Sequence, residues 1–208
     1  MADLGLHEVG AVAPGHYGAE GTGCRIHVAT LGAVWNVQGD PARTSFVADV
    51  QRWFGIALPL VPNTGQRCDA LLALWIGPRS WLLIESAVCG RPAALVDFDA
   101  KREALNRVGG ALFDISASRV AFTIRGAGAA RVLASSCPLD FDSRVFPPGS
   151  CAQSVFGRVS ALYYRHETAP GFSVLVARSL AADVWHALCV AAASEGYDVA
   201  PPAAFDAG

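Results

Sequence analysis

Two cysteines, Cys137 and Cys151, enclose the proline-rich acidic segment CPLDFDSRVFPPGSC, whose residue types can bind a metal or form a redox pair. They lie fourteen residues apart with no close histidine and no Cys-x-x-Cys motif. A zinc site would therefore need two further ligands, and His186 and Cys189, expected on one face of the last helix, are the candidates. Because cysteine is among the most frequently buried residue types, we favour two packed thiols over a metal site.

Carboxylates and hydroxyls in two short segments are the next candidates for chemistry. Asp140 and Asp142 are close enough in sequence for acid–base work, but aspartates beside prolines more often cap turns, and we favour that role. Ser116 and Ser118 lie in DISASR without a histidine nearby in sequence. The chain contains no G-x-S-x-G motif, so nothing in the sequence supports a catalytic triad.

The segment GAGAAR, residues 126–131, follows an expected strand and opens an expected helix, which is the context of a dinucleotide-binding motif. Arg131 stands where the third glycine would be, and no acidic residue follows at the end of a second parallel strand. The related segment GDPAR, which starts at Gly39, lacks the second glycine as well. We therefore interpret the turn as a topological feature rather than a phosphate site.

These candidates must be positioned by an alternation of strands and helices. In the first half, Asp40 is an expected N-cap, Pro41 the first helical residue and Gly55 the end of that helix. Phe46, Val50, Trp53 and Phe54 share one face of it. Apolar runs predict strands at 25–31, 33–39, 71–77 and 81–86, the last two as a hairpin, and a short helix over 99–108.

The second half repeats this order. We expect strands at 111–115, 119–125 and 172–179, one or two strands over 153–166, and helices over 126–137 and 180–195. WNVQGDPAR aligns with FTIRGAGAA at an offset of 87 residues, and in both a strand turns at a glycine directly into a helix.

The repeat predicts a duplicated α+β unit with helices on one face of antiparallel sheets. The expected organisation is an extended N-terminal arm (1–24), a first α+β half (25–110), a second half (111–200) and a loose tail (201–208).

The composition excludes several classes of partner. The net charge of −2 and scattered arginines give no general attraction to nucleic acid or to an anionic membrane. Charged residues form only 16% of the chain, against roughly 25% in typical domains. A surface buried against other chains and an alanine-rich composition explain this equally well.

The sequence also indicates the compartment in which we expect the protein. No run approaches the about 20 apolar residues that a membrane span needs. The start lacks a basic region followed by an apolar one, so we expect a cytoplasmic protein in which the six cysteines are free thiols.

The most specific stretch runs from Gly126 to Gly157 and resembles the gamma subunit of heterotetrameric sarcosine oxidase. That family shows an Asp-x-Ser element, here Asp114–Ser116, then G-x-x-A, CPLD, F-P-x-G-x-C, a threonine or serine, and a glycine, and all occur here in order. Trp81-Leu82-Leu83 and Val184-Trp185 extend the resemblance over most of residues 25–196.

The same stretch looks distantly like the aminomethyltransferase, or T-protein, fold of folate-binding enzymes, with Pro148-Gly149 at the turn before a strand. Those enzymes carry acidic residues on the following strand, near the folate and the amine. The corresponding residues here, RVSALYY (158–164), contain no carboxylate. The resemblance therefore implies a subunit that keeps the fold and lacks the folate-dependent activity.

The resemblance also implies the reaction of the complex, which oxidatively demethylates sarcosine to glycine with hydrogen peroxide and formaldehyde or methylene-tetrahydrofolate. FAD, FMN, NAD and tetrahydrofolate would belong to the alpha and beta subunits and zinc to the delta subunit. This chain would be mainly structural, with no cofactor, metal or catalytic residue of its own. Arg144, Val145 and Phe146, at the tip of the proline-rich loop, are the candidate partner contacts, although an ordinary surface loop with one buried phenylalanine explains them too.

Two alternatives remain. One is the small subunit of a related complex, such as N-methylglutamate dehydrogenase, whose substrate another chain would select. The other is a free-standing folate-binding protein of the T-protein type, against which the missing carboxylate on 158–164 argues.

Overall fold

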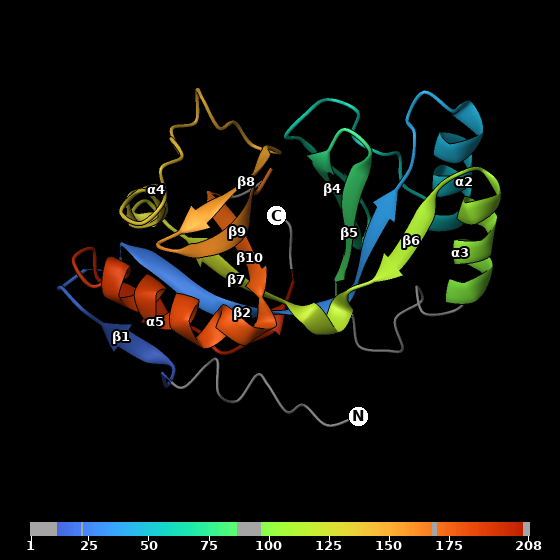
Figure 1. Ribbon diagram of the computed structural model, residues 1–208. Helices are drawn as coiled ribbons and strands as arrows, with labels where there is room; N and C mark the ends of the chain where they lie inside the picture. Colours follow the sequence, from blue (N-terminus) through green and yellow to red (C-terminus); the bar gives the residue numbers. More distant parts are fainter. Residues whose placement is uncertain (1–11, 22, 87–96, 168–169, 206–208) are drawn as a thin grey trace. The chain divides into compact units, whose positions relative to one another are not determined.

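The computed structural model describes residues 12–21, 23–86, 97–167 and 170–205 (Figure 1). The chain divides into two compact units. One is Leu31–Ala117, and the other joins the chain up to Thr30 with the chain from Ser118 onward. The boundaries therefore differ from those expected at residues 25 and 110. The cause is long-range strand pairing, which the order of residues along the chain does not reveal.

In the unit Leu31–Ala117, a strand and a helix are followed by three antiparallel strands, a second helix and a last strand. The C-terminal part of strand β2 (Cys24–Gln38) lies between β5 and β6, and all neighbouring strands are antiparallel. The order across the sheet is β3-β4-β5-β2-β6. Its further elements are α2 (Thr44–Phe54), β3 (Gly65–Cys68), β4 (Leu71–Gly77), β5 (Ser80–Ser86), α3 (Phe98–Arg107) and β6 (Ala111–Asp114).

The second unit repeats this succession, which confirms the duplicated α+β fold. Its sheet has the order β11-β2-β7-β10-β9-β8, in which β11 alone runs parallel to its neighbour on this path. The N-terminal part of β2 is inserted between β7 and β11. The short helix η2 (Ser116–Ser118) spans the boundary between the units, and the elements that follow are β7 (Arg119–Arg125), α4 (Ala129–Ala134), β8 (Cys151–Phe156), β9 (Val159–Arg165), β10 (Gly171–Ala177), η3 (Arg178–Leu180), α5 (Ala181–Ala192) and β11 (Tyr197–Val199).

Each unit has a core between its helices and one face of its sheet. In the first unit Phe46 of α2 packs on Trp81 of β5, with ring centroids 5.9 Å apart. In the second, Phe122 of β7 packs on Trp185 of α5 at 5.5 Å. Figure 1 shows α2 and α3 side by side on the first sheet. Burial of these aromatic side chains is the main stabilising contribution in each unit.

Gly39 and Gly126, which correspond in the two halves, are needed for different structural reasons. Gly126 has φ 113°, in the region that favours glycine, and a Cβ there would lie 2.7 Å from the carbonyl oxygen of Gly23. Gly39 has no such φ, but a Cβ there would overlap the ring of the buried Phe46. The repeated glycine is thus required once by backbone conformation and once by packing.

Several predicted elements are confirmed and others corrected. The hairpin of β4 and β5, α2 with its left-handed Gly55 cap, and the closing helix occur as expected. The strands predicted at 25–31 and 33–39 are one strand, β2, with a register shift between Leu31 and Val34. The helix predicted over 126–137 is only α4, and the segment 153–166 is two strands joined at Gly157.

The N-cap of α2 is not the residue that the sequence predicted. Arg43 occupies the N-cap position of α2, and Asp40 instead accepts a hydrogen bond from the backbone of Ala42 in the preceding turn. Because Asp40, Pro41 and Ala42 form this turn, the helix starts at Thr44 and not at Pro41.

The described parts of the predicted arm and tail are more ordered than expected. In the predicted arm, β1 (Gly15–Tyr17) pairs with β11, and His16 bonds Asp198 at 2.9 Å. In the predicted tail, β12 (Ala203–Ala204) pairs with β2, and Phe205 is 2% exposed. Both segments are too short to be recognised alone, and partners distant in sequence hold them.

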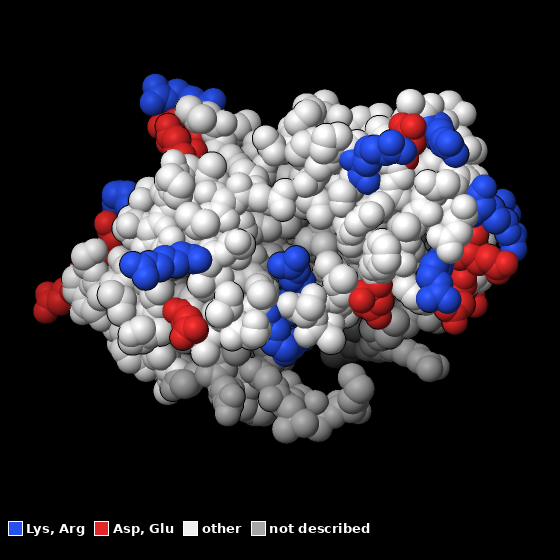
Figure 2. All heavy atoms as spheres, in the orientation of Figure 1, with Lys and Arg blue, Asp and Glu red and all other residues white. Residues whose placement is uncertain are grey.

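The surface is sparsely charged. On the face drawn in Figure 2, most of the surface belongs to other residues, and the charged side chains gather mainly at the right of the view, over α2 and α3, in line with the charged fraction of 16%. In the described part of the chain, no helix is long and apolar enough to cross a membrane.

Candidate functional site

The proline-rich loop from Cys137 to Cys151 is a rigid connection between α4 and β8. Phe141 makes edge contacts with Phe146, Tyr163 and Phe172 at centroid distances of 5.8, 5.3 and 5.4 Å. Phe146 also stacks on Phe172. These rings fasten both arms of the loop to β9 and β10, so the tip is presented on a fixed base.

Arg165 of β9 holds the same loop through its guanidinium group. One nitrogen, Nη1, donates to the carbonyl oxygens of Phe141 and Phe146, each at 3.0 Å. The guanidinium also lies 5.3 Å from the ring centroid of Phe172. Sequence analysis missed Arg165, because nothing local marks an arginine whose acceptors lie about twenty residues upstream.

Asp140 and Asp142 cap turns, as predicted. The carboxylate of Asp140 accepts from the backbone N–H of Asp142 at 2.9 Å, and that of Asp142 accepts from the backbone and side chain of Arg144. The hydrogen bonds from Arg144 lower the pKa of Asp142. Both carboxylates are committed to loop structure.

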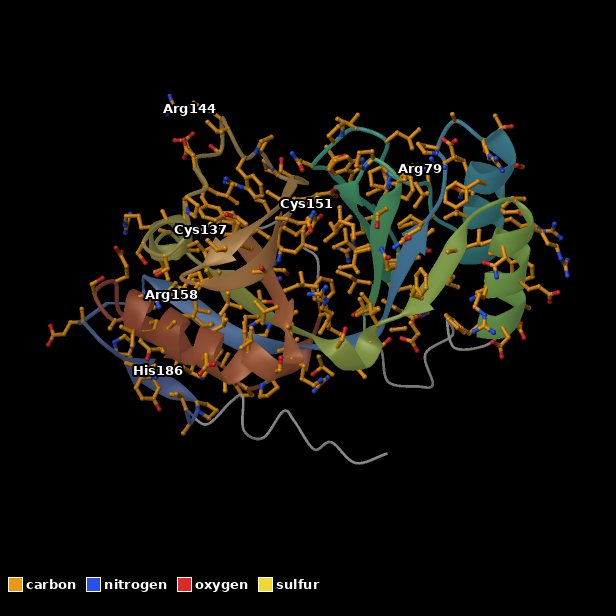
Figure 3. The ribbon with its side chains drawn as sticks, viewed as in Figure 1. Arg79, Cys137, Arg144, Cys151, Arg158 and His186 are labelled. Atoms are coloured by element: carbon orange, nitrogen blue, oxygen red, sulfur yellow. The ribbon has the colours of Figure 1, made fainter. Side chains whose placement is uncertain are left out.

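The three residues predicted at the tip differ in exposure. Val145 is 64% exposed and the side chain of Arg144 is 88% exposed (Figure 3). Phe146 is 7% exposed and belongs to the core. Phe146 supports the loop from within, so the surface available to a partner is Arg144 and Val145.

The two cysteines that frame the loop do not approach each other. Cys137 packs in the helix-side core beside Tyr163, whereas Cys151 lies opposite Tyr164 in the strand register. Because Tyr163 and Tyr164 point to opposite faces of the sheet, so do the two thiols. Both cysteines are buried, and neither forms a disulfide (Figure 3).

The proposed further metal ligands are also separated. His186 and Cys189 lie three residues apart on α5, as expected, but His186 is exposed and Cys189 is 7% exposed. Among the described residues, no three histidine, cysteine, aspartate or glutamate side chains form a group able to hold a metal. Cys89 lies outside the described residues.

The DISASR and GAGAAR segments have structural roles. The hydroxyl of Ser116 donates to Asp114 at 2.5 Å and accepts from the backbone N–H of Val34 at 2.8 Å, which joins η2 to β2. In GAGAAR, the N–H of Gly128 donates to the carbonyl of Gly23 at 2.8 Å. Arg131 pairs with Glu195 in a two-bond contact. The turn of GAGAAR therefore joins backbone segments, as we interpreted it.

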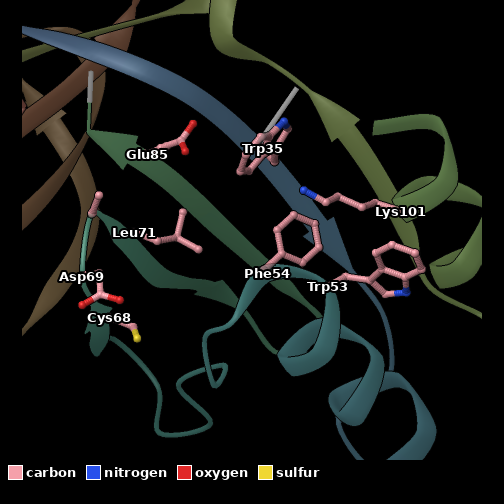
Figure 4. A pocket seen from close by; sticks show the side chains of 9 residues that line it. Trp35, Trp53, Phe54, Cys68, Asp69, Leu71, Glu85 and Lys101 are labelled. Carbon is pink, nitrogen blue, oxygen red and sulfur yellow. The ribbon is translucent and has the colours of Figure 1, made fainter. Parts of the chain in front are cut away.

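A pocket that no motif indicated lies in the unit Leu31–Ala117 (Figure 4). Its volume is about 260 Å³. Aromatic rings from β2 and the end of α2 form its walls, and α3 and β5 add one cation and one carboxylate. The lining residues are Trp35, Trp53, Phe54, Cys68, Asp69, Ala70, Leu71, Glu85 and Lys101.

The polar groups of this pocket are incompletely paired. Among the described residues, Nε1 of Trp35 and Oε2 of Glu85 are buried without a hydrogen-bond partner. Burial raises the pKa of Glu85, while the charge of Lys101 and a backbone hydrogen bond from Ala33 act in the opposite direction. The ammonium group of Lys101 lies 6.0 Å from the ring centroid of Trp35 and 5.3 Å from that of Phe54. An unpartnered buried polar group costs about 1–3 kcal/mol, so this arrangement calls for an explanation.

Comparison with solved structures defines the class of fold. The chain is similar to a chain of the heterotetrameric sarcosine oxidase from Corynebacterium sp. U-96 in complex with pyrrole 2-carboxylate, with a TM-score of 0.74, 23% identity, and coverage of 86% of this chain and 89% of that one. It is also similar to the glycine cleavage system aminomethyltransferase T from Bartonella henselae, with a TM-score of 0.55, 14% identity, and coverage of 87% and 48%. The chain thus has the aminomethyltransferase-like fold that its sequence predicts.

Comparison of sequences then identifies the family. Residues 38–195 match the sarcosine oxidase, gamma subunit family, and the chain belongs to it. The sarcosine oxidase subunit gamma of Corynebacterium sp. (strain U-96) is 31% identical over 112 residues. That alignment covers 53% of this chain and 52% of the relative, so the chain spans about half the length of the curated relative it matches.

Proposed function

We propose that this chain is the gamma subunit of a cytoplasmic heterotetrameric sarcosine oxidase, an oxidoreductase that demethylates sarcosine to glycine with hydrogen peroxide and formaldehyde or methylene-tetrahydrofolate. The observation that carries the proposal is the family match over residues 38–195. Its partners would be the alpha, beta and delta subunits. FAD, FMN, NAD, tetrahydrofolate and zinc would reside in those subunits.

The contribution of this chain to the complex is structural. The residues of the family motifs have structural roles in this chain. Ser116 accepts a hydrogen bond from the backbone of β2, and Cys137 and Cys151 are buried in the unit that carries the proline-rich loop. A strand without a carboxylate at 158–164 supports a role other than folate-dependent transfer. The chain would therefore act by presenting surfaces to the larger subunits.

The tip of the proline-rich loop is the proposed contact. Val145 is an exposed apolar side chain on a base fixed by the phenylalanine contacts and by Arg165. A rigid loop loses little conformational entropy on binding, which favours its use as a contact. Arg144 beside it adds a charge for orientation.

The test is a pull-down of the tagged chain from its native cytosol, with a visible spectrum of the eluate. We expect larger subunits to co-elute with flavin absorbance, and sarcosine to bleach that absorbance. Bleaching by N-methylglutamate alone would instead identify the related dehydrogenase. A colourless chain that elutes alone would overturn the proposal, and calorimetry with tetrahydrofolate would then test the free-standing folate-binding alternative.

The contact is tested separately with Val145→Asp and Arg144→Glu. We expect both to reduce co-elution of the larger subunits, with Val145→Asp the stronger because it places a charge in an apolar contact. Val190→Asp is the matched control, since Val190 is 62% exposed on α5. Unchanged co-elution in both loop variants would remove the tip from the interface.

A further inference from the structure

The structural role proposed above does not use the pocket beside Trp35, which combines aromatic walls with charged side chains. It lies within the unit Leu31–Ala117, so its geometry depends on that unit alone. Ligand pockets are mostly apolar and carry a few polar groups that fix the orientation of the ligand. The aromatic walls of this pocket and its few polar groups, which are Lys101, Glu85, Asp69 and the indole N–H of Trp35, match that description.

The polar groups offer complementary contacts. Lys101, the chain's single lysine, supplies a cation, and the 1% exposed Trp35 supplies an unpartnered N–H among the described residues. Glu85 supplies a carboxylate, one oxygen of which lacks a described partner. In the view of Figure 4, the carboxylates of Glu85 and Asp69 lie on one side of the lining residues and the ammonium group of Lys101 lies on the other.

A ligand with one charge would satisfy only one side of this site. An anion would pair with Lys101 and be repelled by the carboxylates of Glu85 and Asp69, whereas a cation would be attracted by the two carboxylates and repelled by Lys101. A zwitterion places each of its charges opposite a complementary group. We propose that this pocket binds a small zwitterionic amino acid, whose carboxylate contacts Lys101 and whose ammonium group contacts Glu85.

The size and walls of the pocket restrict the side chain of that amino acid. The volume of about 260 Å³ lies below the range of roughly 300–1,000 Å³ typical for drug-sized ligands. Trp53, Phe54 and Leu71 leave an apolar surface for the remainder of the ligand. The site therefore fits a single amino acid with a small or apolar side chain.

The binding test uses the full chain without other subunits, so its outcome is independent of assembly. Glycine, sarcosine, L-leucine and L-phenylalanine would be titrated by calorimetry. Each is compared with its amide, which lacks the carboxylate, and with its des-amino acid, which lacks the amine. We expect saturable binding of at least one zwitterion, about tenfold or more weakened in both analogues. The indole N–H resonance of Trp35 should shift on binding.

Variants assign the binding to this pocket. Lys101→Met and Glu85→Gln remove one charge each while preserving side-chain size, and both should weaken binding about tenfold or more. Arg102→Gln is the matched control, because Arg102 is the next residue of α3 and is exposed. Circular dichroism of each variant confirms that it is folded.

Three results would overturn the proposal. They are no saturable binding of any zwitterion, equal binding of zwitterions and their single-charge analogues, and undiminished binding in folded Lys101→Met and Glu85→Gln variants. None of these results bears on co-elution with larger subunits, so the failure of this inference and of the proposed function are distinguishable.

Discussion

At the scale of single residues, Arg165 shows how one side chain determines the order of a loop. Its planar guanidinium bonds two carbonyl oxygens at once and stacks on Phe172. A lysine carries the same charge but lacks this planar geometry. The fixed conformation of the proline-rich loop therefore depends on the shape of the side chain as well as on its charge.

Arg165→Lys should lower the free energy of unfolding by about 1–3 kcal/mol, because hydrogen bonds from a charged group are lost or weakened. Urea denaturation measures this change, and hydrogen exchange should accelerate in residues 141–149. Arg158→Lys, on the exposed turn between β8 and β9, is the control and should change neither. Equal effects of the two substitutions would contradict the role of Arg165.

The cysteines are expected to differ in reactivity. Burial, followed by the charge of Glu195, raises the pKa of Cys24 to about 11. At pH 8 its reactive thiolate is then populated on the order of one part in a thousand. Cys68 is exposed, so it should alkylate much faster.

Mass spectrometry of peptides after timed iodoacetamide treatment measures these rates. The rate at Cys24 should rise about tenfold per pH unit up to its pKa, because each unit increases the thiolate population tenfold. A fast reaction of Cys24 at pH 8 would show that its thiol is accessible and its pKa normal.

At the scale of elements, packing of a helix on a strand depends on one missing Cβ. Gly39 follows β2, and the ring of Phe46 of α2 occupies the space that a side chain would need. Phe46 is fully buried and cannot move aside without disturbing Trp81. Gly39 therefore permits the close approach of α2 to the sheet, together with Gly110, where a Cβ would also lie 2.7 Å from the ring of Phe46.

Gly39→Ala should reduce the free energy of unfolding by about 1–3 kcal/mol through overpacking. Gly77→Ala is the control, since a Cβ there meets only an ordinary contact at 3.7 Å. Adding Phe46→Leu to Gly39→Ala should recover part of the loss, which a double-mutant cycle in urea would measure. Strictly additive losses would show that the two positions do not interact.

The elements that sequence reasoning predicted well are those specified locally. The hairpin of β4 and β5 follows from two apolar runs around Gly77-Pro78, and the end of α2 follows from Gly55. The continuity of β2 was missed because Gly32 marks a break in sequence, whereas the structure accommodates it at the register shift. The short strands β1, β11 and β12 exist only through partners that are distant in the chain.

The candidate sites divide in the same way. The turn roles of Asp140 and Asp142 could be predicted because each carboxylate accepts a hydrogen bond from a backbone N–H group only two residues further along the chain. The pocket could not be, because Trp35, Glu85 and Lys101 come from three separate elements. The one available signal was that Lys101 is the chain's single lysine.

At the scale of the whole molecule, the low charge has consequences for the chain in isolation. Charged residues are 16% of the sequence, the net charge is −2, and the isoelectric point is about 6.2. Solubility falls as the net charge approaches zero. Under the proposed function, a surface that contacts other subunits would be exposed in the isolated chain and would strengthen this tendency.

We expect the isolated chain to be least soluble close to pH 6.2, as measured by light scattering over a pH series. Co-expression with the alpha, beta and delta subunits should remove this minimum if they cover the apolar surface. A chain that stays monomeric across the series would show that its surface needs no covering.

The path of β2 imposes an order on biosynthesis. Cys24 pairs with Tyr197, 173 residues later, whereas the unit Leu31–Ala117 is continuous. During translation the continuous unit can complete its pairings while the ribosome is still synthesising the C-terminal part of the chain. The first half of β2 can pair with β7 once that strand has emerged, but its other edge stays unpaired until β11 is made. Because such an edge readily joins foreign strands, chaperone protection is needed most during that interval.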